Sequence, residues 1–308
     1  MRSNAFKVLG KPIYFENAIE AQQYAQKHTG TVVVRNNIQE TSLFPEQYKP
    51  LEILEYLDRF IISQDDAKKE IAIAMYYHNL NKKYIDNNYL DKNGPVMIIG
   101  PTGSAKTFIV KKACEYIDIV FVHVDTSSMV SEGIVGYSTG NLAVDIVKKA
   151  KLDIKKAEHC VVFFDEIDKL FQSSDNEYGE EVSNQLLRFI EGTEVHITAK
   201  DVGSKEDMIL KTDNMQFILG GAFQWIIDKK QKEKNSSMGF SLDCLEKDNN
   251  SITLEDLYRE DIPKELLGRM DTIVNVHKLT FDDCYKILTK SESSPLDEFL
   301  KKDRVPWR

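Results

Sequence analysis

The chain has 308 residues and a formal net charge of −9, with 42% hydrophobic and 29% charged residues. This is the composition of a globular protein with a sizeable core, and the length has room for two units. The mean hydropathy of −0.37 and the lack of any apolar run near roughly 20 residues predict no membrane-spanning segment, and the acidic balance disfavours binding of nucleic acid through a basic face.

Cysteine usage and the N-terminus indicate the cellular compartment. The four cysteines, Cys114, Cys160, Cys244 and Cys284, are scattered and form no C-x-x-C pair, so we expect free thiols instead of disulfides or a zinc site. No long apolar region follows the first residues, so no signal peptide is predicted. Together these features predict a cytoplasmic protein.

The first part of the chain is predicted to be a small extension followed by helices. Residues 1–48 form an N-terminal extension of unassigned role, with a short helix over 17–27 and a strand over 31–35. Helical spacing of apolar residues then begins over 51–60 and resumes over 65–83. We therefore expect the second unit to begin with two helices before its first strand.

A glycine-rich loop between a strand and a helix dominates the sequence. An apolar run from Val96 leads into this loop, and helical spacing follows over 107–117. This arrangement is typical of a phosphate-binding P-loop, in which backbone N–H groups face the phosphates of ATP. We expect Lys106 to reach the β and γ phosphates and Thr107 to ligate Mg²⁺. The predicted ATP-binding residues of the loop are Gly100, Pro101, Thr102, Gly103, Ser104, Ala105, Lys106 and Thr107.

One position in this loop departs from the pattern G-x-x-x-x-G-K-[ST]. Ala105 stands where the pattern has its second glycine. Glycine is used where the backbone must approach phosphate or take a positive φ. We expect Ala105 to have a negative φ at the mouth of the helix, where a methyl group costs little, so that the loop keeps its shape.

A second acidic motif follows further along the chain. A buried strand is predicted over 119–124, where His123 is interpreted as a sheet histidine and not a ligand, and one helix is predicted over 142–158. The next strand starts at Cys160 and ends in the adjacent carboxylates Asp165 and Glu166, the form of a Walker B motif.

These two carboxylates are given different roles. Asp165 is predicted to hold Mg²⁺ through water, and Glu166 to polarise the attacking water. Placing both at the end of a buried strand costs desolvation free energy, which a metal and a phosphate nearby would offset.

The remaining chain continues the alternation of helices and strands. The pattern predicts a helix over 180–191, a polar stretch over 192–214, a strand over 215–219, a charged loop over 229–250, a helix over 256–267, a strand over 272–277, and a helix over 281–288 capped by Thr280. Such alternation predicts an α/β fold with a central parallel five-stranded sheet flanked by helices. The ligand is then expected at the carboxyl ends of the strands.

The order of these motifs resembles the AAA+ ATPase core of the ClpX/HslU protein unfoldases, and is closest to ClpX. The matching segments are residues 58–64, 100–107, 132–136, 164–169, 185–193, 220–223 and 262–269. The resemblance implies an AAA+ P-loop NTPase with a large ATPase domain over 49–278 and the start of a truncated helical domain over 279–308. The zinc module of the ClpX family has no counterpart in the leader.

The resemblance also assigns roles around the nucleotide. It implies that Ile61 and Ile62 flank the adenine, with Ser63 replacing a family glycine. It further implies that Arg269 is an arginine finger offered to the γ-phosphate bound by a neighbouring subunit. Hydrolysis would then need a ring of identical subunits, expected to be a hexamer.

Two segments resemble family loops that contact proteins. Gly133, Ile134, Val135 and Gly136 match a pore loop that grips polypeptide, with Ile134 in place of an aromatic residue, and residues around 194–210 would form the second pore loop. Met238, Gly239 and Phe240 match the loop that docks on a ClpP-like peptidase. The implied partners are therefore other copies of the chain, unfolded or tagged protein substrates, and a ClpP-like peptidase.

Three functions remain open from the sequence. The first is an ATP-hydrolysing protein unfoldase or chaperone that delivers substrates to a peptidase. The second is a nucleotide-binding regulatory module with weak or no turnover that modulates a partner or a full-length ring. The third, a motor acting on DNA, is disfavoured by the acidic balance and by the pore-loop match.

Overall fold

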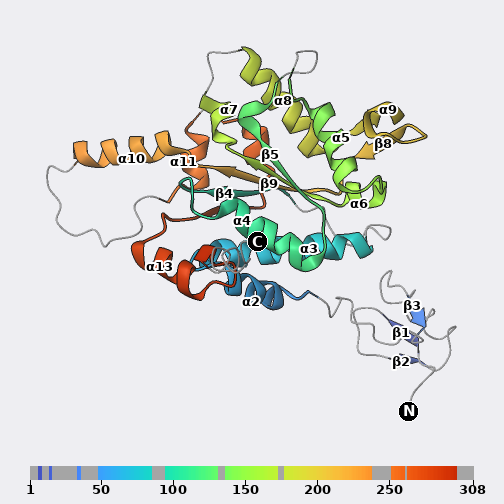
Figure 1. Cartoon of the computed structure of the whole chain (residues 1–308), viewed down its shortest axis with the longest axis horizontal. Coiled ribbons are helices and arrows are strands. Elements are labelled where there is room, and N and C mark those ends of the chain that lie inside the picture. The colour runs from blue at the N-terminus through green and yellow to red at the C-terminus, as the bar shows by residue number, and fades with distance from the viewer. Residues whose placement is uncertain are drawn as a thin grey trace, which may run out of the picture. The chain divides into compact units, whose positions relative to one another are not determined.

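The computed structural model describes residues 6–8, 14–15, 33–35, 48–84, 94–130, 136–172, 177–237, 251–260 and 262–296 (Figure 1). The chain divides into two compact units, Met1–Gln47 and Tyr48–Arg308. In the first unit, β1 (Phe6–Val8) pairs antiparallel with β2 (Tyr14–Phe15) and with β3 (Val33–Arg35). The helix predicted over 17–27 lies outside the described residues.

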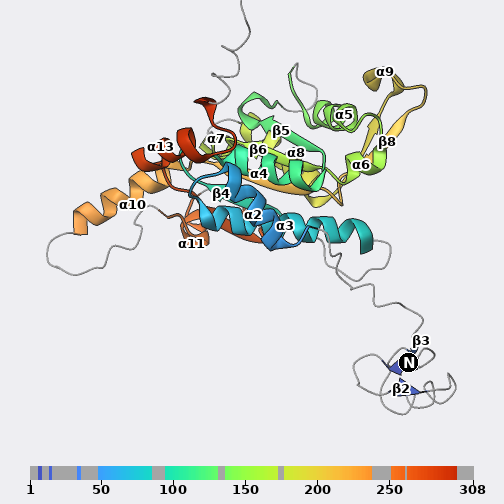
Figure 2. The ribbon, with the colours of Figure 1, turned by 60° about the horizontal axis from the view of Figure 1, so that its bottom comes forward.

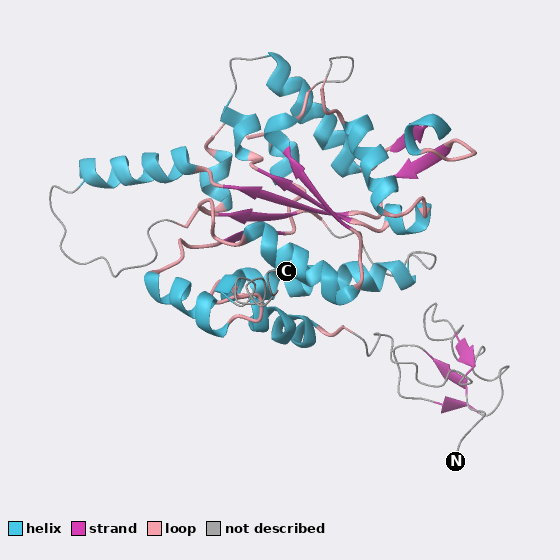
Figure 3. Ribbon diagram, viewed as in Figure 1, coloured by secondary structure: helices cyan, strands magenta, loops and turns pink. Residues whose placement is uncertain are grey.

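The second unit is built on a five-stranded sheet with strand order β10-β4-β9-β6-β5 (Figure 3). The strands are β4 (Val96–Ile99), β5 (Phe121–Asp125), β6 (Val161–Asp165), β9 (Gln216–Gly221) and β10 (Thr272–Asn275). Every pairing between them is parallel. The predicted α/β fold with a central parallel five-stranded sheet is therefore confirmed.

Helices cover both faces of this sheet. Successive side chains of a strand point to opposite faces, so Met97 and Ile99 join one core cluster while Val96 and Ile98 join the other. One face packs against α2 (Pro50–Phe60), α3 (Asp65–Tyr84) and α4 (Lys106–Ile117), and the other against helices that include α5 (Thr139–Lys149) and α8 (Glu177–Glu191), as Figures 1 and 2 show. Burial on both faces explains why β4 is apolar throughout.

The helix predicted over 142–158 is wrong, because the structure contains two helices there. α5 ends at Lys149, and α6 (Ile154–Glu158) begins after a turn in which Lys151 and Leu152 have φ values of 56° and 64°. Asp153 caps α6, since its side chain accepts a hydrogen bond from the backbone N–H of Lys156 at 3.2 Å. Apolar residues on both sides of the turn happen to be in phase, so their periodicity did not reveal the break.

The charged loop predicted over 229–250 is wrong in its first part. α10 (Gln224–Ser237) is a continuous helix, and residues 238–250 lie outside the described part of the chain. Lys and Gln are good helix formers, and two lysines of α10 form ion pairs near α11 (Leu254–Tyr258). Lys229 Nζ lies 2.7 Å from Glu260 Oε1, and Lys230 Nζ lies 2.7 Å from Asp256 Oδ2.

The helix predicted over 256–267 is also two helices. α11 ends at Tyr258, and α12 (Lys264–Leu267) begins directly after Pro263. Proline has no N–H to donate and clashes with a preceding helical turn, so it stands at a helix start. The last described helix, α13 (Phe281–Lys290), has the predicted cap, because Thr280 and Asp283 form a reciprocal capping box.

Five smaller elements complete the described part of this unit. The polar stretch over 192–214 forms an antiparallel hairpin of β7 (Glu194–Ile197) and β8 (Met208–Lys211), with α9 (Ala199–Val202) between them. The helical turn η2 (Thr126–Ser128) follows β5, and α7 (Asp168–Gln172) follows β6. Within the described residues, no helix combines the length and the apolar character that crossing a membrane requires.

Candidate functional site

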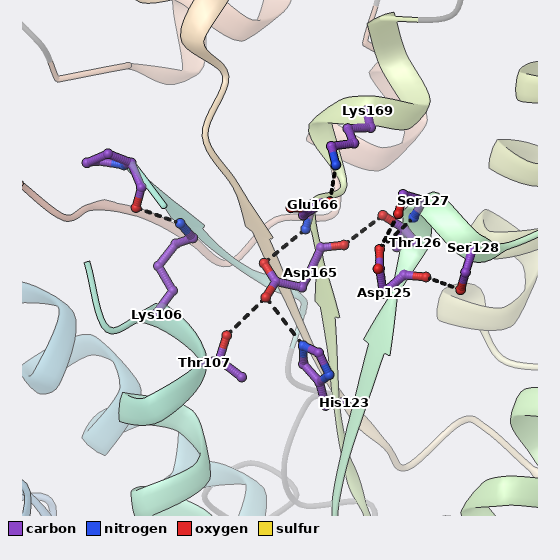
Figure 4. A network of polar contacts seen from close by, with 11 residues as sticks. Lys106, Thr107, His123, Asp125, Thr126, Ser127, Ser128, Asp165, Glu166 and Lys169 are labelled. Carbon is purple, nitrogen blue, oxygen red and sulfur yellow. Dashed lines mark hydrogen bonds and ion pairs between the residues drawn. The ribbon is translucent and has the colours of Figure 1, made fainter. Parts of the chain in front are cut away.

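The predicted site residues meet at the carboxyl edge of the sheet. The P-loop follows β4, Asp165 ends β6 with Glu166 directly after it, and Gly221 ends β9, so parallel pairing brings them together. Figure 4 shows Lys106, Thr107, Asp165 and Glu166 close to one another. A pocket of about 280 Å³ opens between them. It is lined by Thr102, Gly103, Ser104, Ala105, Lys106, Thr107, Phe108, Asp165, Glu166, Asp168, Lys169, Gly221 and Ala222.

The start of the P-loop requires glycine for steric reasons. A Cβ at Gly100 would lie 2.2 Å from the carbonyl oxygen of Val276, which is backbone and cannot move aside. The loop then curls on itself, with the Ser104 hydroxyl donating to the Pro101 carbonyl at 2.7 Å. The P-loop therefore bends directly after β4, beside the end of the neighbouring strand β10.

Lys106 is a buried cation held by this loop. Its Nζ donates to the carbonyl oxygens of Gly100 at 2.7 Å and Pro101 at 3.0 Å, and its side chain is 8% exposed. Burial lowers the pKa of Lys106, and the charges of nearby carboxylates, Asp165 foremost, oppose that shift. Among the described residues, no carboxylate lies within ion-pair distance of Lys106 Nζ. The buried ammonium group can therefore bind an anion that enters the pocket. Such a group fits a nucleotide phosphate.

The conformation expected for Ala105 is wrong. Its φ is 71°, in the left-handed region, instead of the negative value predicted. Ser63, the other residue that replaces a family glycine, also has a positive φ of 57°. Both positions therefore keep the backbone shape of glycine although neither residue favours it. The P-loop therefore keeps its conformation, with local backbone strain at Ala105.

We expect Ala105→Gly to stabilise the protein. The left-handed conformation costs a non-glycine residue roughly 1–2 kcal/mol, and Ala105→Gly removes this cost. The greater freedom of glycine in the unfolded chain lowers the free energy of unfolding by about 0.4–1 kcal/mol, which offsets part of the gain. The net gain in the free energy of unfolding is roughly 0.5–1 kcal/mol, seen as a rise of about 1–3 °C in Tm by calorimetry. Ala74→Gly, inside the helix α3, is the control and should lower Tm. A fall in Tm for Ala105→Gly would contradict the proposed strain.

Thr107 and Asp165, the predicted Mg²⁺ residues, lie in contact. The Thr107 hydroxyl donates to Asp165 Oδ2 at 3.0 Å, and Asp165 Oδ1 accepts from the backbone N–H of Glu166 at 3.0 Å. Thr126 of η2 fixes the strand end, since its hydroxyl donates to the Asp165 carbonyl at 2.7 Å. Hydroxyl and carboxylate oxygens are the donors that suit Mg²⁺, so this pair fits the ion.

Glu166 sits at a sharp bend beyond β6. Its φ is 56°, which turns the chain from the strand into α7. Its carboxylate forms an ion pair with Lys169 Nζ, and this hydrogen bond raises the pKa of Lys169 (Figure 4). Both side chains are partly exposed, so the pair is weak and Glu166 can be released to another partner.

His123 is a sheet histidine of β5, as interpreted, and it also contacts the site through Asp165. Its side chain is 42% exposed, and its Nε2 lies 3.3 Å from Asp165 Oδ2. In β5 the buried residues Val122 and Val124 alternate with the exposed His123 and Asp125. The alternation of apolar and polar residues in this strand was the signal that could have identified His123. Sequence reasoning also gave no role to Thr126 and Lys169.

Arg269 lies at the opposite edge of the sheet from the P-loop. Its carbonyl oxygen is beside Gly94, and the N–H of Asp271 donates to the Pro95 carbonyl at 2.9 Å, so Arg269 is near the amino end of β4. At about 3.3 Å per residue, the extended chain from Pro95 to Gly100 covers roughly 16 Å. Its guanidinium is held by Glu191, with Nη2 3.0 Å from Oε1. The structure therefore does not bring Arg269 to the pocket of its own chain.

The other predicted residues are placed as follows. Ile61 is 3% exposed and belongs to the core that α2, α3 and α4 share, and neither it nor Ile62 lines the P-loop pocket. Gly133, Ile134 and Val135, like Met238, Gly239 and Phe240, lie outside the described residues. Contact of Ile61 and Ile62 with adenine stays a prediction.

The base of the predicted pore loop is closed. The N–H of Val130 donates to the carbonyl oxygen of Tyr137 at 2.8 Å, which brings the two ends of the loop together. A Cβ at Gly136 would lie 2.5 Å from a methyl carbon of Val130, so glycine permits this close approach. Val130 and Tyr137, which lie between β5 and α5, are therefore neighbours.

Comparison with known proteins gives two matches. Residues 91–273 match the model of a family described as AAA domain (Cdc48 subfamily). The chain is also similar to the ATP-dependent Clp protease ATP-binding subunit ClpX of Treponema denticola, with 30% identity over 279 residues. That alignment covers 83% of this chain and 67% of the relative.

Proposed function

The chain belongs to the AAA+ ATPases and is ClpX-like, and from this membership we propose that it hydrolyses ATP with Mg²⁺ in order to unfold proteins. The observation that carries the proposal is the convergence of Lys106, Thr107, Asp165 and Glu166 around one pocket. Phosphoryl transfer needs a cation for the phosphates, oxygen donors for the metal and a carboxylate that orients water. Lys106 is the cation, Thr107 and Asp165 carry the oxygen donors, and Glu166 is the carboxylate.

Each of these side chains has a distinct task. Lys106 holds positive charge where the β and γ phosphates bind, and Thr107 and Asp165 present oxygen atoms to the metal. Bound Mg²⁺ would neutralise charge on the phosphate oxygens. Glu166 orients the attacking water and accepts its proton, after exchanging its contact with Lys169 for one with water.

The position of Arg269 supports a ring. Arg269 lies at the amino edge of the sheet, far from the P-loop of its own chain. In a ring, its guanidinium could instead enter the ATP pocket of a neighbouring subunit. We propose that Arg269 completes the site of the next copy in a hexamer, as the resemblance implies. Its pair with Glu191 is half exposed and therefore weak, so the guanidinium can leave it.

The substrate is proposed to be an unfolded or tagged polypeptide. The loop that ends at Gly136 and the hairpin of β7 and β8 would grip it, and Met238, Gly239 and Phe240 would dock a ClpP-like peptidase. The test is steady-state ATP hydrolysis measured with and without a permanently unfolded protein. We expect turnover that rises severalfold when the unfolded protein is present.

A second function is favoured by one observation. Ala105 holds the P-loop in a strained conformation, which suits a nucleotide-binding regulatory module with little turnover. This alternative predicts tight ATP binding with negligible hydrolysis in both the presence and the absence of unfolded protein. Such a result would rule out the unfoldase proposal and leave a module that modulates a partner or a full-length ring.

A further inference from the structure

A buried glutamine joins the start of α3 to the chain that follows β10. Gln64 stands directly before α3 and is 3% exposed. Its Nε2 donates to the carbonyl oxygen of His277 at 2.7 Å, and its Oε1 accepts from the N–H of His277 at 3.1 Å. One side-chain amide therefore pairs with both backbone groups of His277, as a neighbouring strand would.

The turn that carries Gln64 is held in a strained conformation. Ser63 and Gln64 have φ values of 57° and 61°, although neither is glycine. Such residues stay in the left-handed region only where their surroundings hold them there. The buried ammonium group of Lys68 contributes, since its Nζ lies 2.5 Å from Asp58 Oδ1 and 2.8 Å from Asp65 Oδ1. The amide of Gln64 is thus fixed in its direction toward His277.

The residue before His277 supports the P-loop. The N–H of Val276 donates to the carbonyl of Ile99 at 2.7 Å, and the carbonyl of Val276 leaves no room for a Cβ at Gly100. The carbonyl of Gly100 in turn accepts from Lys106 Nζ at 2.7 Å. Successive residues of an extended chain direct their backbone groups to opposite sides, so Val276 faces the P-loop while His277 faces Gln64. Contacts therefore run without a gap from Gln64 to the buried ammonium group.

We propose that Gln64 is a positioning residue of the nucleotide site, which holds the backbone of His277 and thereby fixes Val276 against Gly100, so that the P-loop and Lys106 keep their places for the phosphates. The inference rests on the proposed function, because the ligand is the triphosphate of ATP. Gln64 does not line the P-loop pocket, so it acts through the backbone on any ligand that binds by its phosphates. Inorganic tripolyphosphate, which has no base, is therefore a suitable probe beside ATP.

The first test needs no variant. Contacts that support phosphate binding are themselves stabilised when phosphate binds, because the coupling is reciprocal. We expect the exchange of the His277 N–H, followed by nuclear magnetic resonance in the full chain, to slow severalfold when tripolyphosphate is bound. The N–H of Ile252, which donates to Asn275 Oδ1 at 2.8 Å, is the internal control and should change less. An equal effect on both amides, or none at His277, would overturn the proposal.

The second test compares two variants. Gln64→Met keeps a long side chain but removes both hydrogen bonds, and we expect it to raise the Kd for ATP and for tripolyphosphate by the same factor, roughly tenfold. Asn275→Leu is the matched control, because the Asn275 amide also pairs with both backbone groups of one residue, Ile252, at 2.8 and 2.9 Å. It should lower Tm as Gln64→Met does, yet leave both Kd values unchanged. Weaker binding in both variants, or in neither, would show a merely structural role and overturn the proposal.

The outcomes separate this inference from the proposed function. An unmodified chain that binds neither ATP nor tripolyphosphate would overturn the proposed function, and this inference with it. An unmodified chain that binds both, with Kd values that Gln64→Met does not change, would overturn this inference alone. If Gln64→Met does not fold, the exchange of the His277 N–H in the unmodified chain decides.

Discussion

Replacing Glu166 by glutamine is expected to reduce ATP turnover by about 10²-fold or more while leaving ATP binding intact. The amide keeps the size of the side chain but cannot accept a proton from the attacking water. Lys106, Thr107 and Asp165, which hold the phosphates and the metal, are unchanged by the substitution. Steady-state phosphate release and binding of a fluorescent ATP analogue measure the two effects separately.

The matched control for this experiment is Glu115→Gln. Glu115 is an exposed glutamate on α4 that pairs with Lys112, on the same helix that begins at the P-loop. The control should turn over ATP at the rate of the unmodified chain. Glu166→Gln with full turnover would show that another group acts as the base, and loss of ATP binding would show that Glu166 supports the pocket instead of the chemistry.

Arg269→Ala is expected to lower turnover by about 10³-fold or more, since an arginine finger contributes that much to phosphoryl transfer. The sharper result concerns mixtures of two inactive proteins. Chains with Arg269→Ala keep Glu166, and chains with Glu166→Gln keep Arg269. In a ring assembled from equal amounts of both, about a quarter of the sites combine an intact Glu166 with an intact Arg269 from the neighbour.

Turnover should therefore reappear on mixing, although each protein alone is inactive. If Arg269 served the pocket of its own chain, no site in the mixture would be complete and activity would stay absent. Arg259→Ala, at an exposed arginine just after α11, is the matched control and should remain active alone. The measurement is phosphate release as a function of the mixing ratio, with a maximum near equal amounts.

Much of the fold and of the pocket could be predicted because the signals are local. The apolar strand before the P-loop, and Asp165 and Glu166 directly after another such strand, each lie within a short stretch of chain. In a parallel sheet, residues that follow strands collect at one edge whatever the strand order. The meeting of Lys106, Thr107 and Asp165 therefore followed from the sequence once the strands were assigned.

The errors occurred where contacts between distant residues decide the local structure. α10 is charged along most of its length, and two of its lysines form ion pairs with distant residues, Lys229 with Glu260 and Lys230 with Asp256. Ala105 has a φ of 71°, and in the same loop the carbonyl of Val276 leaves no room for a side chain at Gly100. These partners are distant in sequence, so the periodicity of apolar residues could not report them.

By itself, the sequence determined the P-loop, the paired carboxylates and the parallel α/β class, because these depend on side-chain types at fixed short spacings. Only the tertiary structure decided that His123 faces Asp165. The physical reason is strand pairing. The register of β5 against β6 sets which side chains of these neighbouring strands meet.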